Sequence, residues 1–262
     1  MSILQRDNWT TNVDFIISDI YEYDMRRAGL SIIKEKGLLT PEEIKKLESM
    51  EKHDSDVAIG KMERSNKELR EKKKEGFKEY RLIFGEMNDL TDDNIISVKK
   101  DAIFCTKYCS ETKIGNHIEF REKNQYHAFL RLPGKGEPNK ELYWNSYTGD
   151  IDVKGIGDDL VSLHKDYLLK SISMVIRKLS SYDNAGALNT LVRLMNDYKF
   201  RRLPAGYYRE FNAESKFKII NSPFYISNCD ECYIDKIDIN YNYAIIRVLW
   251  SIVTQIYNTR RR

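Results

Sequence analysis

The chain has 262 residues, of which 41% are hydrophobic and 11% aromatic, so it can bury a core and is not a disordered chain. Its 43 basic and 40 acidic residues leave a net charge of +3, which alone neither requires nor excludes a nucleic-acid partner. It has no apolar run of roughly 20 residues and no signal-peptide layout, so we expect no membrane contact and a cytoplasmic protein.

The first predicted elements are a strand and two helices. Residues 13–20 alternate and carry β-branched side chains, which predicts a strand that enters a turn over 21–24. A helix is predicted over 26–36, ending at Gly37. A second helix over 41–51 begins with a Thr-Pro-Glu-Glu cap.

The middle of the chain changes from helix to strand. Residues 56–84 consist almost wholly of helix formers and predict a long basic helix or a helical hairpin. Residues 95–107 predict a β-hairpin folded about Lys99 to Asp101. Further strands are predicted over 117–122, 126–132 and 141–146, with a turn over 133–139 between the last two.

The second half is predicted to be mainly helical. A strand over 150–155 comes first. Helices are then predicted over 158–181, 184–199 and 240–258. We therefore expect a mixed domain over 1–156, with a helical insertion at about 38–90, and a helical region over 157–262.

Two aspartates carry the first chemical hypothesis. Asp24 follows a predicted strand and Asp101 lies at the tip of the predicted hairpin. Two-metal phosphoryl transfer needs carboxylates that converge from rigid elements, because they share two divalent ions about 4 Å apart. Strand alternation puts Glu22 on the same face as Asp24, so Glu22 is a candidate further ligand, with a solvent-facing carboxylate as the alternative.

Three segments resemble motifs of the family B DNA polymerases. YEYDMRRAGLSII (21–33) resembles motif A, KKKEGFKEYRLIFG (72–85) resembles the fingers helix with motif B, and VKKDAIF (98–104) resembles motif C, in the family's order. The resemblance implies an α+β fold: an antiparallel-sheet polymerase-type palm with a short helical fingers insertion and a helical thumb-like C-terminal region. Together with the later segment DVKGI (152–156), which resembles the family's segment leading toward the thumb, these motifs cover about half of the chain.

The resemblance implies a metal-dependent nucleotidyltransferase that adds nucleotides to a nucleic-acid primer or acceptor. Asp24 and Asp101 would be its catalytic residues and would bind Mg²⁺ or Mn²⁺, and nucleoside triphosphates would be its substrates. Lys99 replaces the first motif C aspartate, and the motif B asparagine is absent. A non-catalytic nucleic-acid-binding or protein-interaction module on a degenerate palm is therefore the alternative, and an unrelated α+β structural protein is a third. The residues leave open whether a partner protein completes the site.

Three cations are predicted to bind the triphosphate. Lys74, Lys78 and Arg81 are spaced four and three apart, so a helix would place them on one face, where they could neutralise charge on leaving pyrophosphate. Ion pairs with neighbouring glutamates are the alternative. In the family, a tyrosine five residues after the motif A aspartate excludes a 2′-hydroxyl. Gly29 stands at that position here and implies weak discrimination against ribonucleotides.

Nucleic-acid contacts are expected in the second half. Lys154 lies in a Lys-Gly-hydrophobic segment similar to the one that grips the primer end in the family. Aromatic residues alternate with arginines after residue 200, which suits base stacking combined with phosphate binding, while core packing of the aromatics is the alternative. The residues predicted to bind nucleic acid there are Arg201, Arg202, Tyr207, Tyr208 and Arg209.

The four cysteines are predicted to be reduced thiols. Cys229 and Cys232 have the spacing of a zinc knuckle, and Cys105 and Cys109 could supply a second pair. The acidic residues between the first two and the strand placement of Cys105 argue against a zinc site. The four histidines show no metal or triad spacing.

Overall fold

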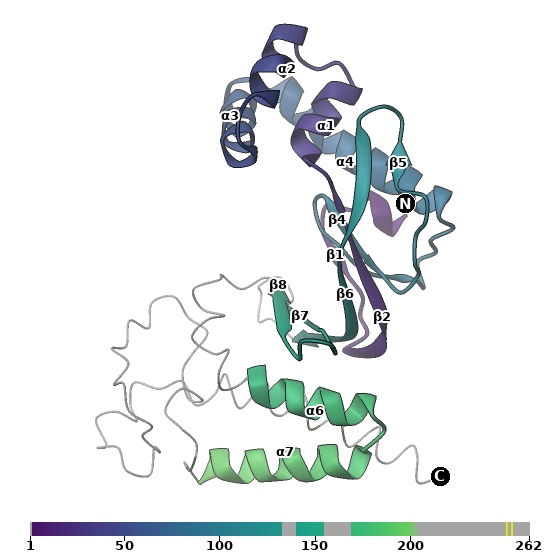
Figure 1. Cartoon of the computed structure of the whole chain (residues 1–262), viewed down its shortest axis with the longest axis vertical. Helices are drawn as coiled ribbons and strands as arrows, with labels where there is room; N and C mark the ends of the chain where they lie inside the picture. Colours follow the sequence, from purple (N-terminus) through teal and green to yellow (C-terminus); the bar gives the residue numbers. More distant parts are fainter. Residues whose placement is uncertain are drawn as a thin grey trace, which may run out of the picture. The chain divides into compact units, whose positions relative to one another are not determined.

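The computed structural model describes residues 2–132, 140–154 and 169–200, together with Arg202, Trp250 and Val253 (Figure 1). The architecture is α+β, with an antiparallel sheet in the order β1-β3-β4-β2-β6-β7-β8 and β5 paired with β6. The chain divides into two compact units: unit 1 comprises Met1–Asn12 and Ser18–Tyr126, and unit 2 comprises Val13–Ile17 and His127–Arg262. Within the described ranges, no helix is long and apolar enough to cross a bilayer.

The sheet of unit 1 combines short strands with two long ones. Its strands are β1 (Trp9–Thr10), β2 (Phe15–Met25), β3 (Ile95–Val98), β4 (Ala102–Cys105), β5 (Lys113–Ile114) and β6 (Ile118–Leu132), of which β2 and β6 each have a part in unit 2. The hairpin predicted over 95–107 is confirmed as β3 and β4, which pair antiparallel.

Strand β2 is longer than the sequence pattern predicts. The predicted turn over 21–24 is wrong, because these residues pair with Ala102–Cys105 of β4. The chain turns later, at Arg27, which has a φ of 44°. The polar residues of this segment favour a turn locally, but a neighbouring strand supplies backbone hydrogen bonds that a local pattern does not reveal.

Strand β6 is also longer than predicted. The strands predicted separately over 117–122 and 126–132 form one continuous strand. The polar residues between them interrupt the apolar pattern, yet two of them donate hydrogen bonds to Glu22 on β2: Lys123 Nζ over 3.3 Å and Asn124 Nδ2 over 2.6 Å. A polar interval therefore remains a strand because its side chains have partners on the next strand.

Four helices complete unit 1. They are α1 (Ala28–Glu35), α2 (Pro41–Glu48), α3 (Lys52–Ser65) and α4 (Lys67–Met87). The predicted stop at Gly37 is confirmed by its φ of +58°, and the predicted cap of α2 by a reciprocal capping box between Thr40 and Glu43. The helical segment predicted over 56–84 is a pair of helices that break at Asn66, whose side chain accepts from Leu69 N over 3.0 Å.

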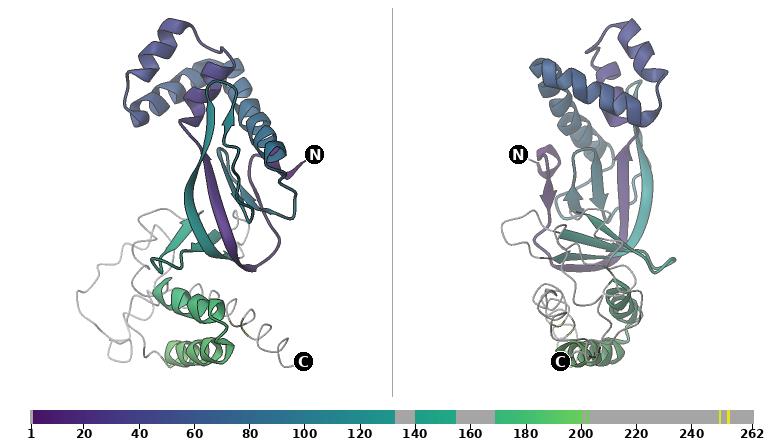
Figure 2. Two further views of the ribbon diagram at one scale, coloured as in Figure 1. Left: turned by 45° about the vertical axis from the view of Figure 1, so that its right-hand side comes forward. Right: turned by 90° about the vertical axis from the view of Figure 1, so that its left-hand side faces the viewer.

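Helix α4 runs along one face of the sheet of unit 1 (Figure 2). Its side chains Phe77, Tyr80 and Phe84 share a buried cluster with Tyr23 and Ile103 of the sheet. The ring centres of Tyr23 and Phe84 lie 5.3 Å apart with the planes tilted by 49°, within the separation that is favourable for aromatic pairs. A second buried cluster, within the four helices, comprises Leu30, Ile33, Leu47, Ile59 and Leu69.

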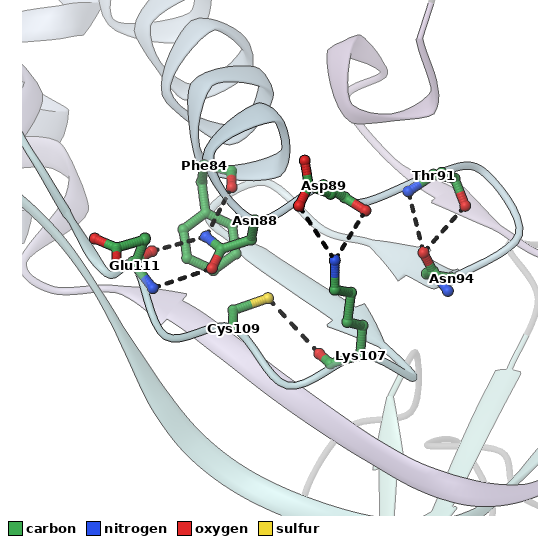
Figure 3. A network of polar contacts seen from close by, with 8 residues as sticks. All are labelled: Phe84, Asn88, Asp89, Thr91, Asn94, Lys107, Cys109 and Glu111. Carbon is green, nitrogen blue, oxygen red and sulfur yellow. Dashed lines mark hydrogen bonds and ion pairs between the residues drawn. The ribbon is translucent and has the colours of Figure 1, made fainter.

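The C-terminal end of α4 is tied to the segment before β5 by one side chain (Figure 3). Asn88 Nδ2 donates to the carbonyls of Phe84 over 2.9 Å and Glu111 over 2.7 Å. The amide of Glu111 donates back to Asn88 Oδ1 over 3.0 Å. The buried carboxamide thus adds a second hydrogen bond to the Phe84 carbonyl, which also accepts from Asn88 N over 3.2 Å, and satisfies both backbone polar groups of Glu111.

Unit 2 contains a small sheet and a helix pair. Strands β7 (Lys140–Trp144) and β8 (Ile151–Lys154) pair antiparallel, and β7 also pairs with β6. Helices α6 (Lys170–Ser180) and α7 (Asn184–Lys199) lie side by side (Figure 1). The turn predicted over 133–139, the start of the helix predicted over 158–181, most of the helix predicted over 240–258 and the boundary at residue 156 lie outside the described residues.

Candidate functional site

The hairpin tip between β3 and β4 is a two-residue turn. Lys99 N donates to the carbonyl of Ala102 over 2.9 Å, and Ala102 N donates back over 3.3 Å. Lys100 and Asp101 between them both keep negative φ. Most two-residue hairpin turns need positive φ to match the strand twist, so this turn depends on support from outside the hairpin.

Arg81 of α4 supplies that support. Its Nη1 donates to the carbonyls of Lys99, over 3.0 Å, and of Lys100. Its Nε donates to the carbonyl of Leu4 over 3.0 Å and its Nη2 to that of Arg6 over 2.6 Å. Arg81 is 1% exposed, and burial lowers its pKa to about 10, against the charges of Asp7 and Asp101. Predicted as a triphosphate ligand, Arg81 instead joins the hairpin tip and the N-terminal segment to α4.

The backbone of the two predicted catalytic aspartates lies on paired segments at this tip. Asp24 pairs with Ala102, and the next amide, Met25 N, donates to the carbonyl of Asp101 over 3.0 Å. The side chain of Asp24 is 15% exposed. Burial and the charge of Asp101 raise the pKa of Asp24, while Lys123 and Arg121, whose Nη2 lies 3.8 Å from Asp24 Oδ2, lower it.

This pair meets part of what a divalent cation needs. Mg²⁺ is commonly held by one or two protein carboxylates and completes its shell with water and substrate phosphates. Asp24 and Asp101 are two such carboxylates on paired backbone segments, and the charge of Asp101 raises the pKa of Asp24, an effect that a bound cation would offset. Among the described residues, no group of three or more His, Cys, Asp or Glu is arranged to hold a metal ion.

Glu22 shares the face of β2 with Asp24, as alternation predicted, but its oxygens are already engaged. Tyr126 Oη donates to Glu22 Oε2 over 2.9 Å and Asn124 Nδ2 to the same oxygen over 2.6 Å. Lys123 Nζ lies 3.3 Å from the other oxygen. This buried carboxylate therefore fastens β2 to β6, and its proposed metal role has no support from the geometry.

A basic pocket of about 340 Å³ is lined by residues of α4, α3, the N-terminal segment and the hairpin tip. Its lining is Asp7, Asn8, Glu63, Arg70, Lys73, Lys74, Phe77, Arg81 and Lys100, which gives five basic against two acidic side chains. Such an excess of cations in a concave site favours a polyanionic ligand.

The lysines of this basic pocket have different surroundings. Lys73 is buried and forms an ion pair with Glu63. The Nζ atoms of Lys73 and Lys100 lie 5.9 and 5.2 Å from the centre of the Phe77 ring. Lys74 is exposed and its Nζ lies 2.9 Å from Asp7 Oδ2. A phosphate ligand can therefore reach Lys74 and Lys100, which are exposed, at a smaller cost than Lys73, whose ion pair is buried.

Sequence reasoning found Lys74 and Arg81 but missed Arg70, Lys73 and Lys100. A signal for Arg70 and Lys73 was present in the sequence, since residues 70, 73, 77 and 81 recur at helical spacing on one face of α4. Lys100 comes from a hairpin far along the chain, and only the tertiary structure brings it to this face.

A family model described as bacteriophage PBS1 gene 130 protein matches residues 2–255. The chain belongs to this family. No curated protein matches the chain. The description of this phage protein family names no activity.

The remaining residues predicted to bind nucleotide or nucleic acid lie in separate places. Gly29 lies on α1, and a Cβ there would be 3.8 Å from both Lys73 Nζ and Ile59 Cδ1, so it borders the basic pocket. Lys78 pairs with Asp7 over 3.1 Å and does not line the basic pocket. Lys154 belongs to unit 2, where its Nζ lies 2.7 Å from Asp152.

The aromatic and arginine-rich segment lies mostly beyond the described ranges. Arg202 is described: its Nη1 is 4.0 Å from Asp197 and its guanidinium lies 5.1 Å from the Phe200 ring. Cys105 and Cys109 are buried free thiols that share a hydrogen bond, which raises the pKa of Cys105 and lowers that of Cys109. Arg201, Tyr207, Tyr208, Arg209, Cys229 and Cys232 lie outside the described residues.

Proposed function

We propose that unit 1 is a reduced polymerase-type palm that binds a nucleoside triphosphate in the basic pocket and transfers its nucleotidyl group to a nucleic-acid primer or acceptor. One observation carries the proposal: a single two-residue turn contributes Lys100 to the pocket and Asp101 to the aspartate pair. Nucleotidyl transfer needs cations for the departing phosphates close to carboxylates for the metal, and this turn carries one residue of each kind.

The residues would divide the work as follows. Asp24 and Asp101 would hold Mg²⁺ or Mn²⁺, which supplies electrostatic stabilisation to the reacting phosphate when bound. Lys74 and Lys100 would bind the outer phosphates and balance the charge that gathers on the leaving pyrophosphate. Arg81 would keep the turn rigid, because its bonds to the Lys99 and Lys100 carbonyls fix the backbone from which Asp101 projects.

A second candidate is nucleic-acid binding without catalysis. Arg121, on β6, lies 3.8 Å from Asp24, so a protein cation already balances part of that carboxylate. Lys99 stands where the resembled family has its first motif C aspartate. In this reading the same basic pocket would bind backbone phosphates of a single strand.

Incorporation assays with primed and unprimed DNA and RNA, each with Mg²⁺ or Mn²⁺, separate the two candidates. We expect Asp24→Asn and Asp101→Asn to lower incorporation at least about 100-fold, because each removes a charged metal ligand, while triphosphate binding persists. Asp14→Asn is the control, since Asp14 lies in an exposed ion pair with Arg131 of unit 2. Unchanged incorporation in either site variant contradicts the mechanism.

The basic pocket is tested by the double variant Lys74→Ala and Lys100→Ala. It should weaken triphosphate binding more than 10-fold, because two phosphate contacts are lost. If the unmodified protein incorporates no nucleotide but binds single-stranded nucleic acid, with a salt dependence that this double variant flattens, the non-catalytic candidate holds.

A further inference from the structure

Asp7 places a carboxylate of the chain itself in the basic pocket. Its Oδ2 lies 2.9 Å from Lys74 Nζ and its Oδ1 lies 3.1 Å from Lys78 Nζ. These lysines are four residues apart on α4, so their ammonium groups point the same way. Each oxygen of one anionic group thus binds a different cation, which is how a bridging phosphate would occupy the two lysines.

The backbone on both sides of Asp7 is held in place. Arg81 donates to the carbonyl of Arg6 over 2.6 Å, and Ser97 Oγ donates to the carbonyl of Trp9 over 3.1 Å. Trp9 also pairs with Val98 in the sheet. The backbone of the N-terminal segment is therefore held on both sides of Asp7 by contacts that do not involve the Asp7 side chain.

The ion pairs of Asp7 are accessible to water. The side chain of Asp7 is 50% exposed, and those of Lys74 and Lys78 are 52% and 34% exposed. Exposed ion pairs are weak because water screens the charges and long side chains lose entropy when they are held. A phosphate group that carries more charge can therefore displace this carboxylate.

We propose that Asp7 is an internal competitor for phosphate: its carboxylate occupies Lys74 and Lys78 until a polyphosphate ligand displaces it, which lowers the ligand's affinity and speeds its release. This inference rests on the proposed function, since it takes the basic pocket to bind phosphate groups. The competitor belongs to a fixed segment, so displacement needs only rotation of the Asp7 side chain and no movement of the fold.

The test is calorimetric titration with inorganic triphosphate, which contains the phosphates without base or sugar. We expect Asp7→Asn to bind it about threefold to tenfold more tightly than the unmodified protein, because an exposed ion pair no longer has to be broken and a repelling charge is gone. Asp7→Ser, which also lacks the carboxylate, should show the same gain. When Asp7→Asn is made in a Lys78→Ala background, the gain in triphosphate affinity should be smaller, because the Asp7 carboxylate then holds one lysine instead of two.

Glu68→Gln is the matched control. Glu68 also forms an exposed pair on α4, with Lys72 over 2.7 Å, but neither residue lines the basic pocket, so affinity should not change. An equal gain of affinity in Glu68→Gln, or unchanged affinity in Asp7→Asn, overturns the inference about Asp7. In either case, triphosphate binding that depends on Lys74 and Lys100 still supports the basic pocket. If none of these proteins binds triphosphate, the proposed function fails together with the inference.

Discussion

Met25 N donates to the carbonyl of Asp101 over 3.0 Å, and this backbone bond fixes Asp24 beside the tip of the β3–β4 hairpin. Strand pairing therefore brings the backbone of Asp24 next to that of Asp101, and the charge of Asp101 acts against ionisation of Asp24. An arrangement that costs stability in the protein alone is expected where function requires the charges.

The first prediction follows from that cost: Asp24→Asn should raise the free energy of unfolding at pH 7 by roughly 0.5–2 kcal/mol. Burial, first, and the charge of Asp101 raise the pKa of Asp24 in the folded state. The folded state then binds the proton more tightly, so the contribution of Asp24 is favourable at low pH and is lost as the pH rises through its folded-state pKa. Denaturant unfolding at several pH values measures this, and the advantage of asparagine should vanish below the ordinary pKa of 3.8.

A less stable Asp24→Asn at pH 7 would show that the ion pair of Asp24 with Arg121 outweighs burial and repulsion. Asp14→Asn is the reference, because Asp14 is exposed and its change should stay within about 0.5 kcal/mol.

The second prediction concerns the clamp at the hairpin tip. Arg81→Lys should lower the free energy of unfolding by about 2–4 kcal/mol, because an ammonium cannot reach carbonyls of both the hairpin and the N-terminal segment and leaves buried acceptors unpaired. Arg70→Lys on the same helix is exposed and should be nearly neutral. Urea unfolding of the two variants decides it, and equal small effects would mean that the clamp contributes nothing to stability.

The third prediction compares two helical glycines. Gly29→Ala should stabilise the protein by about 0.5–1 kcal/mol, because a Cβ there meets only ordinary contacts at 3.8 Å and alanine favours the helix. Gly76→Ala should destabilise it, because a Cβ there would lie 2.5 Å from Ile32 Cγ2 in the packing of α4 against α1. Thermal unfolding measures both shifts, and a gain of stability in Gly76→Ala would contradict this close packing.

The fourth prediction uses two asparagines of the network in Figure 3. Asn88→Asp should cost about 2–4 kcal/mol at pH 7, because a carboxylate cannot donate to the carbonyls of Phe84 and Glu111 and faces both. Asn94→Asp should be tolerated, because Asn94 Oδ1 only accepts, from the amide and hydroxyl of Thr91. Denaturant unfolding compares the isosteric pair. Similar losses in both would mean that charge, and not the lost donor, sets the effect.

The family resemblance predicts that Gly29 replaces the tyrosine that excludes a 2′-hydroxyl. The structure places Gly29 next to Lys73 at the edge of the basic pocket, so the ribose preference of any nucleotide incorporation stays a prediction. Comparing matched ribo- and deoxyribonucleoside triphosphates in the assays above measures it.

Local features of this protein could be predicted because their causes are local. The cap at Thr40, the stop at Gly37 and the hairpin about Lys99 to Asp101 depend on a few consecutive residues, and each is present. The pairing of the hairpin with β2 agrees with the predicted neighbouring hairpin, while the metal role of Asp24 and Asp101 stays a prediction.

The sequence by itself determined the cap of α2, the end of α1 at Gly37 and the β3–β4 hairpin. Only the tertiary structure decided that Arg81 is an internal clamp, that Glu22 fastens two strands, and that Asp7 occupies the lysines of α4. A charged side chain in a sequence looks the same whether it faces a ligand, a carbonyl or an opposite charge. Which of these it meets depends on backbone segments distant in the chain, such as residues 4–7 and 99–101, that pack against the same helix face because the buried core brings them there.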